Sequence, residues 1–223
     1  MRLYVYFTDS HKRMLDEYFL PSLIPGEYTL TIGQLPQRDP RGRFRTKGFN
    51  ETMRERALLT AQAVRVAQQE GEEFFVQTDC DIQFFGRTVE ILLNAIDGND
   101  LVAESAKSWR GDGPRLSGGF FICRASDLMY DVWSQIAARV TATTNEQQLL
   151  NRKKIRRQFR CNTLDNRFWS PRRKWAPGQP LHVPDDIVMH HANWTLGVGN
   201  KMKMLAAVRA KVQKRKDDPA RKD

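Results

Sequence analysis

Residues 74–81 read Phe-Phe-Val-Gln-Thr-Asp-Cys-Asp, an apolar run that ends in two acidic residues. Side chains of an extended chain alternate between two sides, so Asp79 and Asp81 are expected to point the same way. Neighbouring carboxylates repel each other and favour a shared proton or a shared cation. Two oxygen ligands at the exposed end of a buried strand therefore suggest a Mg²⁺ or Mn²⁺ site, typically one that serves a phosphate-bearing substrate. A simple turn cap by either aspartate stays open as the alternative.

Strand-like and helix-like segments alternate along the chain. Strands are expected near residues 2–7, 28–32, 74–76, 100–103, 119–123 and 187–191. Helices are expected near residues 11–20, 51–70, 86–96, 126–140 and 144–158. The second helix would begin at Asn50 as N-cap and end at Gly71. The alternation predicts an α/β protein whose sheet is covered on both faces, with ligands bound beyond the carboxyl ends of its strands.

The composition describes a globular protein of 223 residues with 40% hydrophobic and 28% charged residues. This length suits one α/β domain. No apolar stretch approaches the ~18 residues of a membrane span, and residues 1–7 are too short for a signal peptide. Cys80, Cys123 and Cys161 lack metal-type spacing and are expected to be free thiols in a reducing compartment. We therefore expect a cytoplasmic protein.

Basic residues concentrate in two segments although the whole chain carries only a net charge of +10. Residues 152–174 hold ten Lys/Arg and one Asp, and residues 201–223 hold nine Lys/Arg and three Asp. This pattern suggests docking onto a phosphate-bearing ligand, an anionic membrane or a nucleic acid. A nucleic-acid-binding module would explain the first segment but leaves the acidic pair unexplained. A solvated helix face followed by a disordered tail is the plain alternative.

A second group of candidate residues lies near the C-terminus. The apolar run at residues 187–189 leads into His190 and His191, then a glycine-containing turn with Gly197, then Lys201. Imidazole as a third ligand favours Mn²⁺ over Mg²⁺. Glycine permits a close approach of backbone amides to a diphosphate, and Lys201 supplies a point charge to the same oxygens. One histidine of the pair is expected to be a packed core residue.

Two further segments complete the pattern. Ser117-Gly118-Gly119 enters an apolar strand, and its small residues let a ligand ring lie close to the backbone. Residues 145–151 are polar at the start of a helix, for which a plain cap is the alternative.

In this order the four segments resemble GT-A glycosyltransferases, in particular the nucleotide-diphospho-sugar transferase group, which is similar to glycogenin-like and galactosyltransferase-like enzymes. Asp79-Cys80-Asp81 fits the DxD motif, and residues 191–201 fit the terminal His-x-Asn-Trp...Gly...Lys segment. The strand at Ser117 lacks the family's asparagine, and Glu146 stands where the family has aspartate. The resemblance covers roughly residues 2–205.

The resemblance implies a single GT-A, Rossmann-like domain over residues 1–205, with a mixed central sheet flanked by helices. Residues 206–223 would form a basic C-terminal tail, partly helical or disordered. The implied reaction moves a sugar from a nucleotide diphosphate, expected to be a UDP-sugar, to a hydroxyl of a saccharide or glycoconjugate acceptor, with Mn²⁺ or Mg²⁺. A metal-dependent nucleotidyltransferase or phosphohydrolase is the alternative enzyme class. Independently of the resemblance, their charge suggests that the basic C-terminal segments face an anionic membrane surface or a polyanionic acceptor.

The resemblance also implies roles for individual residues. The metal ligands would be Asp79, Asp81 and His191. Donor contacts would come from Thr8, Asp9, Arg54, Asp79, Asp81, Ser117, Gly118, Gly197 and Lys201, with Arg56 as an alternative to Arg54. The catalytic candidates are Glu146, Gln147 and Asp112, with Asp165 as a further carboxylate base. A retaining enzyme would place Gln147 near the reacting carbon, and an inverting enzyme needs one of the carboxylates as base.

Overall fold

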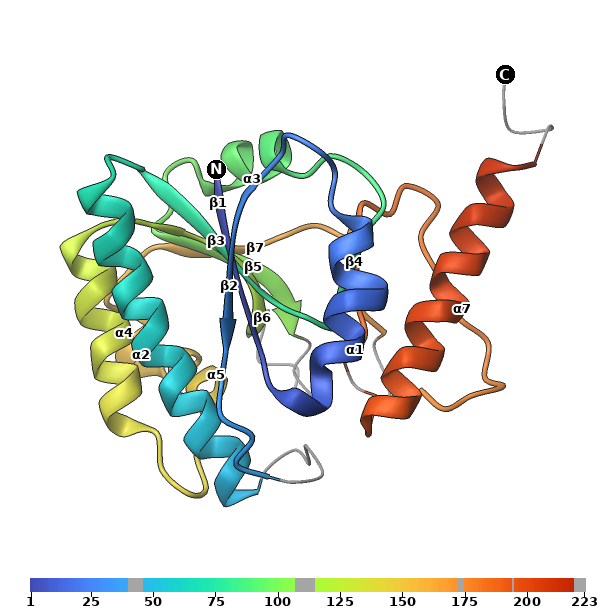
Figure 1. Cartoon of the computed structure of the whole chain (residues 1–223). Coiled ribbons are helices and arrows are strands. Elements are labelled where there is room, and N and C mark those ends of the chain that lie inside the picture. Colours follow the sequence, from blue (N-terminus) through green and yellow to red (C-terminus); the bar gives the residue numbers. More distant parts are fainter. Residues whose placement is uncertain (40–45, 107–114, 172–174, 194, 219–223) are drawn as a thin grey trace.

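The computed structural model describes residues 1–39, 46–106, 115–171, 175–193 and 195–218, and shows an α/β architecture (Figure 1). Within these ranges the central sheet has the strand order β2-β1-β3-β6-β5-β7. Its strands are β1 (Arg2–Phe7), β2 (Thr29–Gln34), β3 (Phe74–Asp79), β5 (Leu101–Ala106), β6 (Arg115–Arg124) and β7 (Cys161–Thr163). Strand β1 is parallel to β2 and β3, whereas β6 is antiparallel to β3 and β5. The sheet is therefore mixed, as predicted.

Helices α2 (Lys47–Gln69) and α4 (Asp127–Arg139) lie side by side on one face of the sheet (Figure 1). Val64 and four alanines of α2 share a buried cluster there with Trp133 of α4 and Phe121 of β6. The short helices α5 (Glu146–Leu150) and α6 (Lys153–Arg156) extend this layer. The N-cap of helix α4 is Ser126, whose hydroxyl accepts a hydrogen bond from the Met129 amide.

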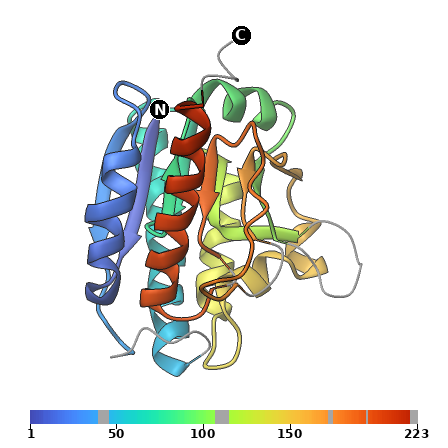
Figure 2. The same cartoon turned by 90° about the vertical axis from the view of Figure 1, so that its right-hand side faces the viewer.

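The opposite face carries α3 (Val89–Ile96), an irregular helical segment over residues 9–22 that contains α1 (Lys12–Met14), and a small second sheet. In that sheet β9 (Met189–His191) lies between β4 (Ile82–Phe84) and β8 (Phe168–Trp169). Helix α7 (Val198–Lys216) forms the outer layer beside the α1 segment (Figure 2). The second sheet brings the C-terminal part of the chain to the end of β3.

Three helix predictions differ from the structure in their bounds. Helix α2 begins earlier than expected, because Thr46 is its N-cap. Asn50 lies inside the helix, where its side-chain amide donates to the Ala142 carbonyl at 2.6 Å. The helix expected at residues 144–158 is two short helices, α5 and α6. The helix expected from residue 86 begins only at Val89, and the Phe85 amide before it still donates to the Val188 carbonyl beside the second sheet at 2.8 Å.

Helix α7 runs through the expected domain boundary at residue 205. Met204, Leu205, Val208 and Val212 are buried along it, and they pack against Met14 and Ile187. Residues 206–216 therefore continue a docked helix. Among the helices that the structure describes, none combines the length and apolar character that a membrane crossing needs.

Candidate active site

The acidic pair lies where two parallel strands end. Asp79 is the last residue of β3 and pairs with Tyr6 near the end of β1, so the β1 loop and the acidic pair share one edge of the sheet. Asp81 follows after one residue and is 2% exposed. A buried carboxylate needs a charged or hydrogen-bonding partner, and the structure supplies it from distant segments.

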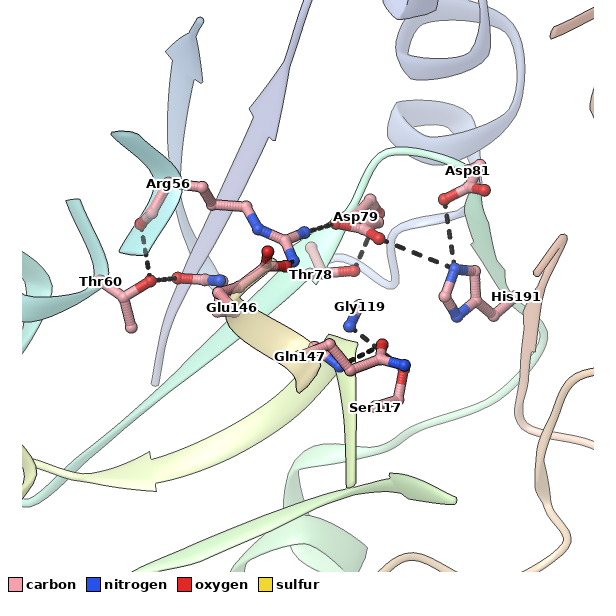
Figure 3. A network of polar contacts seen from close by, with 12 residues as sticks. Arg56, Thr60, Thr78, Asp79, Asp81, Ser117, Gly119, Glu146, Gln147 and His191 are labelled. Atoms are coloured by element: carbon pink, nitrogen blue, oxygen red, sulfur yellow. Dashed lines mark hydrogen bonds and ion pairs between the residues drawn. The ribbon is translucent and has the colours of Figure 1, made fainter. Parts of the chain in front are cut away.

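His191 completes the pair because β9 is antiparallel to β4. His191 lies opposite Ile82, and the Ala192 amide donates to the Asp81 carbonyl at 2.9 Å. The Nε2 atom of His191 lies 3.4 Å from Asp81 Oδ1 and 3.8 Å from Asp79 Oδ2 (Figure 3). One ligand atom from each of these three residues lies within 4.8 Å of the others. The arrangement is a potential binding site for a divalent cation.

His190 points away from this site because side chains alternate along β9. Its ring is tilted against Trp169 at a centroid distance of 5.1 Å, and its Nδ1 lies 3.2 Å from Gln83 Nε2. Burial, together with the neighbouring His191, lowers the pKa of His190 to about 3. His190 is therefore the packed core histidine of the pair.

Glu104 of β5 holds the other nitrogen of His191, a contact that sequence reasoning missed. His191 Nδ1 lies 2.6 Å from Glu104 Oε2, and both side chains are buried. Although burial disfavours the charged ring, the carboxylates of Glu104 and Asp81 raise the pKa of His191 well above its usual range. The sequence feature that could have identified Glu104 is its position as the lone acidic residue in the otherwise mainly apolar run of residues 101–106.

Lys201 reaches the same site from the first turn of α7. Its Nζ lies 2.5 Å from Asp81 Oδ2. Burial favours a neutral carboxyl, but Lys201 and His191 hold the pKa of Asp81 well below its usual range. Gly197 is the residue before α7 and has φ of +84°, a conformation that favours glycine. This turn directs the start of α7 toward the acidic pair.

Of the two arginines considered on α2, Arg56 lies in the cluster with Asp79 and Arg54 does not. Arg54 is exposed, whereas Arg56 is 6% exposed and forms ion pairs with both Asp79 and Glu146 (Figure 3). The two arginines lie two residues apart, which on a helix corresponds to a rotation of about 200°, so Arg54 points away from the cluster that Arg56 joins. Burial raises the pKa of Glu146 even though Arg56 opposes this shift.

Ser117, Gly118 and Gly119 belong to an irregular stretch of β6. Ser117 Oγ accepts a hydrogen bond from the Gly119 amide at 3.1 Å, and the Gly118 amide donates to Gln147 Oε1 at 3.0 Å. A Cβ on Gly119 would overlap His191 Cε1 and lie 2.8 Å from Asp79 Oδ2. The glycine at 119 therefore leaves the space in which these two side chains meet.

The loop after β1 holds Thr8, Asp9 and His11. Asp9 Oδ1 accepts from Gln34 Nε2 at 2.6 Å, and Thr8 Oγ1 lies 3.1 Å from His11 Nδ1. Burial, with the nearby positive charge of Lys201, lowers the pKa of His11 to about 4. His11 was not predicted as a site residue, because only the fold brings it near Lys201.

Two predicted carboxylates are not part of the described cluster. Asp165 is exposed and paired with Arg167 at 2.7 Å. Asp112 lies outside the described residues. Of the predicted carboxylates, Glu146 is consequently the one that the described structure brings into this network, and Gln147 lies beside it through its bond to the Gly118 amide.

Known structures share this α/β arrangement. A glycosyltransferase involved in glycosylation of the major capsid of PBCV-1 covers 93% of this chain and 100% of its own, with 14% identity and a TM-score of 0.60. The galactosyltransferase LgtC, solved with donor and acceptor sugar analogs, covers 93% of this chain and 96% of its own, with 10% identity and a TM-score of 0.51. A search of curated proteins gave no significant match. The fold is that of GT-A glycosyltransferases.

The family follows from the sequence itself. A family model described as nucleotide-diphospho-sugar transferase matches residues 27–205, and the chain belongs to this family. The resemblance inferred from the four segments is confirmed, as are the α/β fold class and the assignment to the glycosyltransferases.

Proposed function

We propose that this protein transfers a sugar from a nucleotide diphosphate, a UDP-sugar, to a hydroxyl of a saccharide or glycoconjugate acceptor, and that transfer depends on Mn²⁺ or Mg²⁺. The observation that carries the proposal is the meeting of Asp79, Asp81 and His191, whose ligand atoms lie within 4.8 Å of one another. Family membership supports the nucleotide-sugar donor.

The residues present fit a divalent cation. Carboxylate oxygens suit Mg²⁺ and Mn²⁺, and the added imidazole favours a transition-type ion such as Mn²⁺. His191 directs its Nε2 toward both carboxylates because Glu104 holds Nδ1. Gly119 keeps the space beside them free of a side chain. When bound, the cation would act as a Lewis acid on the departing diphosphate.

The remaining charged residues would act on the donor. Lys201 would supply positive charge to the diphosphate, and Gly197 would let the first amides of α7 approach it. Thr8 and Asp9 would hold the nucleotide base at the end of β1. These roles are supported by the common position of the β1 loop, the acidic pair and the start of α7 at one sheet edge.

The sugar would lie toward α5. Ser117 and Gly118 border this helix, and Gln147 already bonds the Gly118 amide. Arg56 connects Glu146 to Asp79, so the carboxylate on the sugar side is electrostatically coupled to the metal side. We assign Glu146 and Gln147 to contacts with the reacting sugar.

The test is release of free UDP from UDP-sugars by purified protein. EDTA and Asp81→Asn should each abolish it, and added Mn²⁺ should restore the EDTA-treated enzyme. The expected loss for Asp81→Asn is at least 100- to 1000-fold, on the order seen when one charge-stabilising group is removed. Asp97→Ala, at an exposed aspartate after α3, is the control and should retain wild-type rates. Metal-independent release would contradict the proposal.

The nucleotide is tested separately by thermal unfolding with UDP-, GDP- and dTDP-sugars, each with and without Mn²⁺. Stabilisation by UDP-sugars in the presence of metal is expected, because a ligand that binds only the folded state raises its stability. Stronger stabilisation by GDP- or dTDP-sugars would overturn the assignment of UDP.

A further inference from the structure

The ring of His191 lies between two groups of acidic side chains. Its Nε2 faces Asp81 and Asp79, while its Nδ1 lies 2.6 Å from Glu104 Oε2. The ring is 3% exposed and Glu104 is 1% exposed, so water does not compete for this contact. Two nitrogens of one imidazole are thus committed to different partners.

Within the ranges that the structure describes, the contact with His191 is the hydrogen bond that accompanies the burial of Glu104. Carboxylates are almost never fully buried without a partner. Among the described residues, Oε2 bonds to His191 and Oε1 has no hydrogen-bond partner. Glu27, by contrast, is a buried glutamate with a plain structural use, since its Oε2 accepts from the Thr88 amide at 2.7 Å. The position of Glu104 therefore points to His191.

The sheet is distorted at this point. Ala103 pairs with Phe121 and Ser105 with Leu116, so the single residue Glu104 lies opposite the four residues 117–120 of β6. Such irregularities redirect side chains and are frequent beside active sites. Here the irregular stretch includes Gly119, the residue that makes space for His191.

We propose that Glu104 is a positioning residue for His191: its carboxylate accepts the Nδ1 proton, fixes the ring, and leaves the Nε2 lone pair available to the divalent cation. The proposal rests on the metal-dependent function proposed above and extends it by one residue. Histidine ligands of metals generally donate their second N–H to a carboxylate, carbonyl or water, and loss of that partner weakens metal binding 10–100-fold.

The experiment titrates the protein with Mn²⁺ alone and follows free Mn²⁺ by electron paramagnetic resonance. Glu104→Leu has no acceptor for the Nδ1 proton and should bind Mn²⁺ about 10–100-fold more weakly than the wild type. Glu104→Gln retains an acceptor oxygen and should lose less. Glu27→Gln is the matched control, because it alters a buried glutamate away from His191, and it should bind Mn²⁺ like the wild type.

Several outcomes overturn the role of Glu104. A folded Glu104→Leu protein with wild-type Mn²⁺ affinity would do so and would leave the metal-dependent function intact. Equal weakening by Glu27→Gln would show that the loss reflects general destabilisation. Absence of Mn²⁺ binding by the wild type would overturn the proposed metal dependence together with this role.

A second measurement covers the case in which Glu104→Leu does not fold. Long-range ¹H–¹⁵N correlation spectra of the wild type with Mg²⁺ report which ring nitrogen of His191 carries the proton. A proton on Nδ1 and none on Nε2 is the expected result. A proton on Nε2 in the Mg²⁺-loaded protein would overturn the proposal.

Discussion

Gly119→Ala should damage the candidate site by a steric effect alone. The added Cβ would overlap His191 Cε1 and lie 2.8 Å from Asp79 Oδ2 and 3.1 Å from His191 Nε2. Carbon atoms in contact are normally about 3.5–4.0 Å apart, so one side chain must move by roughly 1 Å. Neither moves easily, because Glu104 holds the His191 ring and Arg56 pairs with Asp79.

The expected magnitude has two parts. Inserting a methyl group into a packed site typically costs about 1–3 kcal/mol of the free energy of unfolding. The displaced ring should also weaken Mn²⁺ binding by about 10–100-fold, the range seen when a ligand's support is lost. The assays are urea unfolding and Mn²⁺ titration on the same preparations.

Gly86→Ala is the matched control. A Cβ at Gly86 would meet Val188 Cγ1 at 3.5 Å, which is ordinary contact, so both measured quantities should stay near wild type. If Gly119→Ala bound Mn²⁺ with wild-type affinity and unfolded like Gly86→Ala, the described packing around His191 would be incorrect.

Three further predictions concern charges. Arg56→Met leaves two carboxylate partners uncompensated and should cost about 3–5 kcal/mol in urea unfolding, whereas exposed Arg54→Met should change stability by less than about 0.5 kcal/mol. The pKa of His190 is about 3 in the folded protein and ~6.5 in the unfolded chain, so its contribution to the free energy of unfolding is present above pH 6.5 and is lost as pH falls from there, by about 1.4 kcal/mol per pH unit. His190→Gln should therefore lose stability less steeply than the wild type between pH 6.5 and 4, and an identical pH dependence would contradict the buried, neutral ring. Lys201→Met should slow UDP release about 100- to 1000-fold, whereas Lys203→Met, at an exposed position, should keep the wild-type rate. Equal rates for the two variants would contradict a role of Lys201 in stabilising the departing diphosphate.

The parts of the site that follow strands were predictable from the sequence. The apolar run that ends in Asp79 implies a strand end, where an open α/β sheet binds its ligands. His191 instead reaches the site from β9 of the second sheet, and the sequence resemblance alone had placed it with the acidic pair. The helix pattern also predicted a helix near residues 126–140, where the structure has α4. Periodicity could not choose between His190 and His191, since both belong to one strand; the resemblance made that choice.

The parts that depend on distant ion pairs were not predictable in this way. The apolar pattern of α2 gave no reason to bury Arg56, because its partners Asp79 and Glu146 are far away in sequence. Glu104 was missed for the same reason, since its partner His191 follows 87 residues later. Local sequence patterns indicate which side of a helix or strand is apolar, whereas the opposite charge that stabilises a buried charged side chain comes from a distant segment that only the fold brings close.

Calorimetric titration of UDP into the wild-type protein, with Mn²⁺ and again with EDTA, tests the metal-assisted binding of a nucleotide diphosphate most directly. If Asp79, Asp81 and His191 hold a cation that contacts the diphosphate, UDP should bind with Mn²⁺, and binding should be lost with EDTA. Equal UDP affinity in both titrations would contradict the assignment of these three residues as a metal site for the donor.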